Sequence, residues 1–317
     1  VGFLARILHH LALRTSGLAV MAALHMVATD MDGTFLRPAS DVVGHANGSI
    51  GERSRAVATS LAHDGVVFAI ATGRPAPALQ PHIDALGIVL PCICFNGAAV
   101  LRMAPHAPSE ALHLQPLAPP AVAAVLAFAD AEDLCCSYSL FDRAVARCAG
   151  AAQRALLDEY MRLEGVGQAI VGTTAELSAL PAPLKLVLLT TTPDATAARA
   201  RAAVPGAHVV AAEMHVEFLS PGVHKGEALA WLCAKAARRM CSTCSTRAPR
   251  RAAPRRAAVA SLASALAQSA AHARGLEGPP LPCSPGARRA SQEGLPLSAL
   301  VAFGDNHNDT EMLRAAG

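Results

Sequence analysis

The sequence predicts an α/β protein whose core is an open parallel β-sheet. Three short apolar runs favour this fold class, because each is typical of a buried strand and each stops abruptly at polar residues. Ligands of such sheets bind beyond the carboxyl ends of the strands, so polar residues placed there face a prospective substrate. The runs cover residues 25–29, 66–71 and 300–303, and they end at Asp30, Thr72 and Gly304-Asp305.

The first run leads into Asp30-Met31-Asp32-Gly33-Thr34, where Gly33 permits a tight turn. Two carboxylates two residues apart at a strand end suit covalent phosphate chemistry, because a carboxylate that attacks phosphorus divides hydrolysis into two easier steps. We interpret Asp30 as the nucleophile. A plain turn is the competing interpretation, whereas a calcium loop is excluded because Phe35 occupies the position where that loop needs glycine.

The second run ends at Thr72-Gly73-Arg74. The Thr72 hydroxyl and the Gly73 backbone N–H can donate hydrogen bonds to the equatorial oxygens of a phosphoryl group. Asn96, which follows another apolar stretch, is a weaker candidate for the same role. Taken alone, such a tripeptide after a strand is more often structural.

Lys225-Gly226 precedes a segment whose apolar residues recur at helical spacing. We therefore expect Lys225 at the start of a helix, where its charge adds to the positive end of the helix dipole and favours a bound phosphate. A lysine on its own is more often a solvated surface charge.

The third run is followed by two acids, Asp305 and Asp309. An anionic nucleophile approaches a phosphate dianion only when positive charge screens both, and Mg²⁺ does so with few carboxylates and several waters. We expect Asp30 and Asp305 to supply side-chain ligands to Mg²⁺.

These four segments, in this order, resemble the four motifs of the haloacid dehalogenase-like phosphohydrolases, and most of all the Cof-type subfamily. The resemblance spans about residues 26–317. It implies a Rossmann-like parallel sheet core and a Mg²⁺-dependent phosphomonoester hydrolase that forms an aspartyl-phosphate. It further implies that Asp32 is the acid/base and offers its backbone carbonyl to the metal, and that Asp309 supports the metal site.

An inserted α/β cap domain is expected over residues 98–215, between the second and third motifs. This stretch has its own strand pattern at 184–189 and its own helix pattern at 153–161. In the resembled subfamily such a cap closes on the core and selects the substrate. The core then comprises residues 26–97 and 216–317, with hinges near Gly97 and residues 220–222.

Residues 238–297 depart from the family pattern, which has only a short link here. The segment is rich in Arg, Ala, Pro and Ser, and no acid occurs between Glu227 and Glu277. We interpret it as a flexible insertion or a mistranslated segment that contains one alanine-rich helix at 257–271. Nucleic-acid binding is the less favoured alternative, because no aromatic residues interleave the arginines. The net charge of +3 depends on these arginines, so the expected enzyme itself is acidic.

The two ends of the chain also depart from the pattern. Residues 1–25 contain arginine and histidine without acids, which fits an organellar presequence or a leader upstream of a start at Met21 or Met26. The chain stops at Gly317, where family members continue, so we expect a truncated core. Nine scattered cysteines favour a reducing compartment, and no apolar run reaches the length of a membrane span.

The expected partner is a small phosphorylated metabolite, with sugar phosphates as the leading class; the oligomeric state is left open. Two alternatives remain from the sequence. One is a phosphomutase on the same core, since fold does not fix function. The other is a non-catalytic truncated remnant.

Overall fold

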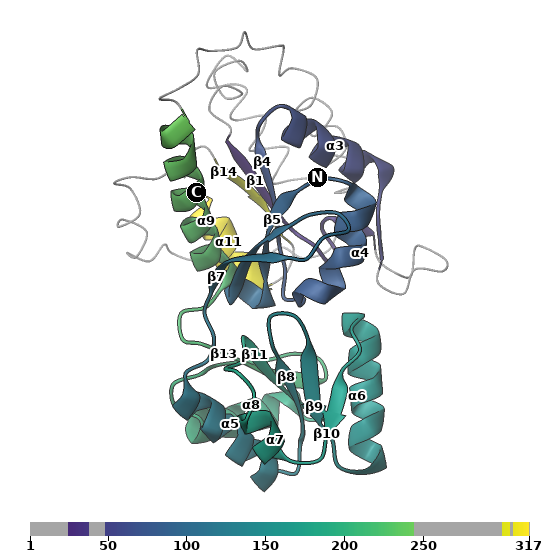
Figure 1. Cartoon of the computed structure of the whole chain (residues 1–317). Helices are drawn as coiled ribbons and strands as arrows, with labels where there is room; N and C mark the ends of the chain where they lie inside the picture. The colour runs from purple at the N-terminus through teal and green to yellow at the C-terminus, as the bar shows by residue number, and fades with distance from the viewer. Residues whose placement is uncertain (1–24, 38–47, 244–299, 305–306, 317) are drawn as a thin grey trace, which may run out of the picture.

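The computed structural model describes residues 25–37, 48–243, 300–304 and 307–316 and shows two lobes (Figure 1). Each lobe is built around its own six-stranded sheet. We call residues 119–219 the cap lobe, and the remaining described residues the core lobe. The chain passes between the lobes twice, after residue 115 and after residue 219.

The core sheet has the strand order β14-β1-β4-β5-β6-β7. Its first four strands are parallel, and β6 and β7 continue the sheet in antiparallel fashion. The three strands predicted from apolar runs are therefore confirmed as neighbours in one sheet. The bounds are β1 Met26–Asp30, β4 Val67–Ala71, β5 Leu90–Cys94, β6 Ala99–Met103, β7 Glu110–Leu114 and β14 Leu300–Phe303; β2 Leu36–Arg37 and β3 Ser49–Ile50 form a separate two-stranded hairpin.

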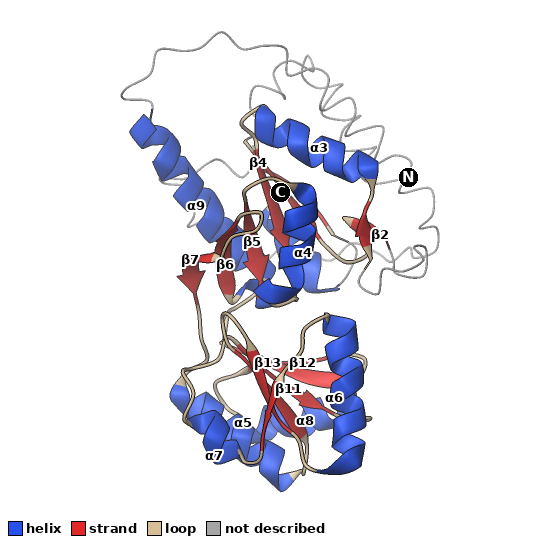
Figure 2. Ribbon diagram, turned by 45° about the vertical axis from the view of Figure 1, so that its right-hand side comes forward, coloured by secondary structure: helices blue, strands red, loops and turns tan. Residues whose placement is uncertain are grey.

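Helices cover both faces of the core sheet (Figure 2). Along β1, Val27 packs on the side of α3 and α4, whereas Met26 and Ala28 pack on the side of α9 and α11. This alternation is the period of a strand that is buried on both faces, which explains why the sequence shows a continuous apolar run. The bounds are α3 Glu52–His63, α4 Ala76–Leu86, α9 Lys225–Thr243 and α11 Thr310–Ala315, with 3₁₀ turns η2 Phe95–Gly97 and η5 His307–Asp309.

The cap sheet has the strand order β10-β9-β8-β11-β13-β12 and is mostly antiparallel. Helices α5, α7 and α8 pack on one face through a large apolar cluster, and α6 packs on part of the other face. The predicted strand and helix of the insertion are confirmed as β11 and α6. The bounds are α5 Pro119–Ala131, β8 Cys135–Ser139, β9 Ala144–Arg147, α6 Gly150–Glu164, β10 Ala169–Val171, α7 Thr174–Ser178, β11 Lys185–Leu189, α8 Pro193–Ala203, β12 His208–Ala211 and β13 His215–Leu219.

Sheet membership differs from the predicted domain boundaries at 97/98 and 215/216. Strands β6 and β7 belong to the core sheet, because the chain reverses at η2 and β6 pairs directly with β5. Strand β13 belongs to the cap sheet, where it lies between β11 and β12. From this we propose hinges at residues 116–118 and 220–224, in place of Gly97 for the first and in agreement with the expected residues 220–222 for the second.

The long Arg-rich segment lies mostly outside the described residues, as do residues 1–24. Helix α9 extends to Thr243, so residues 238–243 continue that helix instead of opening the insertion. The predicted helix at 257–271 is not described. Within the part of the chain that is described, no helix has both the length and the hydropathy needed to cross a membrane.

Candidate active site

The carboxyl ends of the parallel strands bring the predicted site residues to one edge of the core sheet. Asp30 is the last residue of β1, Thr72 follows β4, and Asn96 lies in the turn after β5. Gly304 follows β14. Asp305 lies outside the described residues. The remaining predicted residues come from neighbouring elements: Lys225 begins α9, and Asp309 ends η5.

Lys225 is the centre of the site. Its Nζ lies 2.6 Å from Oδ1 of Asp30 and 2.7 Å from Oδ1 of Asp309. All three side chains are buried, and Lys225 is only 1% exposed. Two carboxylates therefore share one ammonium out of contact with bulk water.

The pKa of Asp30 is raised to about 6. Burial is the largest cause, because it disfavours the charged form. Lys225 opposes the shift through charge and a hydrogen bond, and the negative charge of Asp309 adds to it. Asp30 is thus a carboxylate whose ionised form is incompletely compensated by the residues around it.

Two glycines allow the elements of the site to approach closely. A Cβ on Gly304 would lie 2.5 Å from the Cβ and Cγ of Asp309, so only glycine at the end of β14 leaves room for that side chain. A Cβ on Gly226 would lie 2.5 Å from the backbone oxygen of Glu311 in α11. The glycines of the third and fourth motifs thereby place Lys225 beside Asp309.

Asp32 has Arg74 as its described side-chain partner. Its two carboxylate oxygens accept hydrogen bonds from Arg74, at 2.9 Å from Nε and 2.6 Å from Nη2. The side chain of Asp32 is about half exposed, whereas that of Arg74 is 14% exposed. This two-point contact fixes the orientation of the Asp32 carboxylate at the mouth of the site.

The loops after β4 and β5 are joined to each other. The backbone N–H of Asn96 donates to the carbonyl of Thr72 at 3.1 Å, and the Thr72 hydroxyl accepts from the N–H of Arg74 at 3.2 Å. The Asn96 side chain donates to Glu217 of the cap lobe at 2.8 Å and accepts from Asn308 at 3.2 Å. Asn96 therefore joins the loop after β5 to the cap lobe and to the loop that carries Asn308, and the phosphate contact predicted for it stays a prediction.

The haloacid dehalogenase-like hydrolase family model matches residues 27–240, which is more than half of the chain. The chain belongs to this family. The resemblance predicted from the four motifs is confirmed, and so is the α/β fold class. No curated protein sequence matches the chain.

Solved structures share the fold of this haloacid dehalogenase-like hydrolase at low sequence identity. TM0651 from Thermotoga maritima is 16% identical, with a TM-score of 0.59 over 93% of this chain and 84% of that one. BT1666 from Bacteroides thetaiotaomicron is 14% identical, with a TM-score of 0.59 over 93% and 82%. The sugar phosphatase BT4131 is 14% identical, with a TM-score of 0.50 over 69% and 76%.

The residues at the strand edge fit a hard divalent cation. Among the described residues no group of three His, Cys, Asp or Glu side chains is gathered closely enough to hold a metal ion. Asp30 and Asp309 meet at Lys225, however, and both offer only carboxylate oxygens, the donors that Mg²⁺ prefers over nitrogen or sulfur. Asp305, the further predicted ligand, is the neighbour of Gly304 in the sequence but lies outside the described part.

Sequence reasoning assigned no role to Arg74, Lys185 or Glu217. Arg74 binds Asp32, and Lys185 and Glu217 form a buried ion pair in the cap lobe. A signal was present for the last two, because each interrupts an otherwise apolar run, at 184–189 and 216–219. A charged residue inside a buried strand needs a partner, and that need marks it for attention.

Proposed function

We propose that this haloacid dehalogenase-like hydrolase is a phosphatase that cleaves the phosphate monoester of a small metabolite through an aspartyl-phosphate at Asp30. The observation that carries the proposal is the buried contact of Lys225 with both Asp30 and Asp309 at the carboxyl edge of the sheet. This contact keeps a carboxylate oriented where substrates of such sheets bind. The same intact cluster argues against a non-catalytic remnant.

In the first step a carboxylate oxygen of Asp30 forms a bond to phosphorus while the bond from phosphorus to the ester oxygen breaks. The leaving alkoxide takes a proton from Asp32, which is thereby left as a carboxylate. The two hydrogen bonds from Arg74 keep the Asp32 side chain oriented for both steps.

In the second step a water molecule attacks the phosphorus of the aspartyl-phosphate. Asp32 accepts a proton from this water, and the bond between phosphorus and the Asp30 oxygen breaks. Inorganic phosphate leaves, and both carboxyl groups return to their starting protonation states.

Hydrogen-bond donors for the phosphoryl oxygens come from residues around Asp30. An ammonium group has three N–H donors, and Asp30 and Asp309 accept from two of those of Lys225, so the third can donate to a phosphoryl oxygen. The Thr72 hydroxyl and the Gly73 backbone N–H complete the set that we propose. Such preorganised donors stabilise charge that spreads over the equatorial oxygens in the transition state.

Mg²⁺ would be held by Asp30, by the backbone carbonyl of Asp32 and by Asp305, with Asp309 supporting it. When bound, it supplies positive charge that screens the carboxylate from the phosphate dianion.

A sugar phosphate is the substrate class that we propose. Two points support it: the fold is shared with the sugar phosphatase BT4131, and the cap lobe lies against the loops that carry Gly73 and Asn96. A lobe in this position contacts the leaving group and thereby decides which ester is accepted.

The test is hydrolysis of p-nitrophenyl phosphate by the wild-type chain and by Asp30→Asn, each with Mg²⁺ and with EDTA. We expect turnover only for the wild-type chain with Mg²⁺. A screen of sugar phosphates under the same conditions then tests the substrate class. Equal turnover by Asp30→Asn would contradict the proposal, because that variant lacks the nucleophile. Circular dichroism of the variant establishes that it is folded.

A further inference from the structure

A second buried lysine joins the two lobes. Lys185, the first residue of β11 in the cap lobe, is only 1% exposed. Its Nζ lies 2.8 Å from Oε1 of Glu217 on the neighbouring strand β13. The same Nζ donates to the backbone carbonyl of Gly73 in the core lobe at 3.2 Å.

Glu217 makes the second contact across the seam between the lobes. Its Oε2 accepts from the side-chain amide of Asn96 at 2.8 Å. Asn96 in turn accepts from Asn308, the neighbour of Asp309 in the sequence. A continuous chain of polar contacts thus leads from the cap lobe to the loops that carry the proposed phosphate donors.

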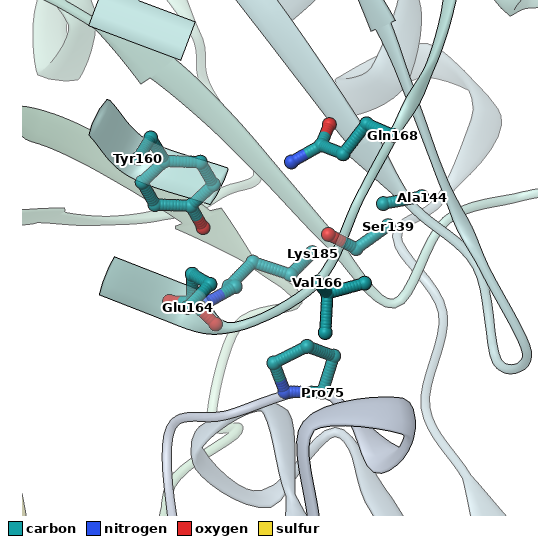
Figure 3. Close-up of a pocket in the computed structure, with 8 residues that line it drawn as sticks. All are labelled: Pro75, Ser139, Ala144, Tyr160, Glu164, Val166, Gln168 and Lys185. Carbon is teal, nitrogen blue, oxygen red and sulfur yellow. Dashed lines mark ion pairs between the residues drawn. The ribbon is translucent and has the colours of Figure 1, made fainter. Parts of the chain in front are cut away.

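Lys185 also lies at the edge of a pocket in this seam (Figure 3). Every lining residue comes from the cap lobe except Pro75, which directly follows Arg74 of the second motif. Glu164 lines the same pocket, 4.0 Å from the Lys185 ammonium. The pair therefore lies where the cap lobe contacts the loop between β4 and α4.

Stability alone does not account for a charged pair in this position. A buried ion pair loses its hydration, and apolar residues of similar volume in its place are often neutral or stabilising. Burial alone would raise the pKa of Glu217, yet Lys185 and His215 hold it below its usual range. Burial alone would lower the pKa of Lys185, yet Glu217 and other neighbours hold it above its usual range. Both groups are charged, and each also makes one contact with the core lobe.

The turn that receives these contacts is strained. Phe95 and Asn96 have φ angles of 53° and 55°, in the left-handed region that a bulky residue such as Phe95 seldom adopts. Such conformations persist only where surrounding contacts hold them, and they gather at functional sites. Glu217 supplies one of those contacts to Asn96, and the backbone of Thr72 supplies another.

We propose that the Lys185–Glu217 pair is a positioning device: it fixes the cap lobe on the core lobe and holds the Gly73 and Asn96 loops in the geometry that binds the transferred phosphoryl group. This inference rests on the proposed phosphatase function. It assigns neither residue to the chemistry itself, because neither contacts Asp30 or Asp32 through any described hydrogen bond.

The experiment compares the double variant Lys185→Met/Glu217→Leu with the wild-type chain. Replacing both members avoids leaving one charge buried without its partner, so the fold should persist, and a melting curve verifies this. The matched control is Arg147→Met, which removes a buried cation of the cap lobe that pairs with Asp130 and makes no described contact with the core lobe.

The first readout is hydrogen exchange of the Phe95 and Asn96 amides, whose acceptors are the carbonyls of Arg74 and Thr72. The second is the inhibition constant of inorganic phosphate against p-nitrophenyl phosphate, together with kcat/KM.

We expect faster exchange at the two amides, a higher inhibition constant for phosphate, and a ten- to hundredfold loss of kcat/KM in the double variant, with none of these changes in the control. Unchanged exchange and unchanged kcat/KM in a folded double variant would overturn the inference. So would equal changes in the double variant and the control. If the wild-type chain hydrolyses no phosphate ester, faster exchange confined to the double variant still supports the positioning role, and it is the phosphatase proposal that fails.

Discussion

Each lobe of this protein buries one lysine beside a carboxylate, but the pKa of the carboxylate is shifted in opposite directions in the two lobes. Lys225 in the core lobe and Lys185 in the cap lobe are equally buried, and each pairs with a carboxylate at 2.6–2.8 Å. The pKa of Asp30 beside Lys225 is nevertheless raised to about 6, whereas that of Glu217 beside Lys185 is lowered. Burial is the largest cause for both groups and raises both pKa values. Lys185 and His215 outweigh it at Glu217, whereas Lys225 does not outweigh it at Asp30, where the charge of Asp309 adds to the rise.

Asp30 shares its lysine with a second fully buried carboxylate, Asp309. Lys185 also has a second carboxylate near it, but Glu164 lies farther away, at 4.0 Å. Glu217 in addition receives a contact from His215 at 3.4 Å and a hydrogen bond from the amide of Asn96. In the core lobe the ionised form of Asp30 is disfavoured, and a bound cation would stabilise it. The cap pair is satisfied, as a positioning contact requires.

Of the substitutions at the two lysine sites and their neighbours, Lys225→Met is expected to have the largest effect. Two buried carboxylates would lose their shared cation, so we expect a loss of about 3–5 kcal/mol in the free energy of unfolding. The proposed phosphoryl contact would be lost as well, with a fall in kcat of about a thousandfold. Urea denaturation and steady-state kinetics measure the two effects. Lys235→Met is the control, because Lys235 lies exposed on the same helix; an equal loss there would refute the role of Lys225.

The next effect concerns Asp32, which the site leaves half exposed. In Asp32→Asn the proposed base for the second step is missing, so we expect a fall in kcat of about a hundredfold. Because p-nitrophenolate leaves readily without a proton, the first step should persist. Rapid mixing should therefore show a burst of p-nitrophenol of about one equivalent per site, followed by slow turnover. A uniform slow phase without a burst would argue against Asp32 as the base.

A third prediction uses the raised pKa of Asp30 in metal-free protein. Folding favours the protonated form, so the stability contributed by this group is complete below pH 3.8 and is lost as pH rises to about 6. Asp30→Asn remains neutral, and above pH 6 it should exceed the wild-type stability by up to about 3 kcal/mol. Near pH 4 the two should be close. Urea denaturation in EDTA at both pH values tests this, and a variant gain that is the same at both would contradict it.

The smallest effect is expected from Arg74→Lys. Lysine keeps the positive charge but cannot bind both oxygens of Asp32 in one plane, so the carboxylate loses its fixed orientation. We expect a loss in kcat of about tenfold with a simple alkyl phosphate, whose leaving group needs the proton, and a smaller loss with p-nitrophenyl phosphate. Equal losses with both substrates would show that Arg74 does not act through the acid/base step.

The core site was predictable because its parts are set by local pattern and by sheet topology. Continuous apolar runs identified β1, β4 and β14, and parallel strands bring their carboxyl ends to one edge. Asp30 and Lys225 meet although 195 residues separate them in the sequence, because each stands at the end or start of an element that local periodicity reveals.

The cap seam was not predictable in the same way. The lobes contact each other through Lys185, Glu217 and Asn96, and no periodicity indicates which cap strand faces which core loop. The place of β6 and β7 in the core sheet was also missed, because an antiparallel strand after a tight turn can extend either sheet equally well by its pattern. The pairing of the strands in the folded protein decides which sheet a strand joins and which loops it faces.

The most direct test of the account asks where the phosphoryl group goes. Asp32→Asn, which should hydrolyse the intermediate slowly, is mixed with p-nitrophenyl phosphate and Mg²⁺, quenched in acid and analysed by peptide mass spectrometry. The account predicts one added phosphoryl group, on the peptide that contains Asp30, and none when Asp30 is also replaced by Asn. Release of p-nitrophenol without a phosphorylated peptide, or phosphorylation of another residue, would contradict the assignment of Asp30 as the nucleophile.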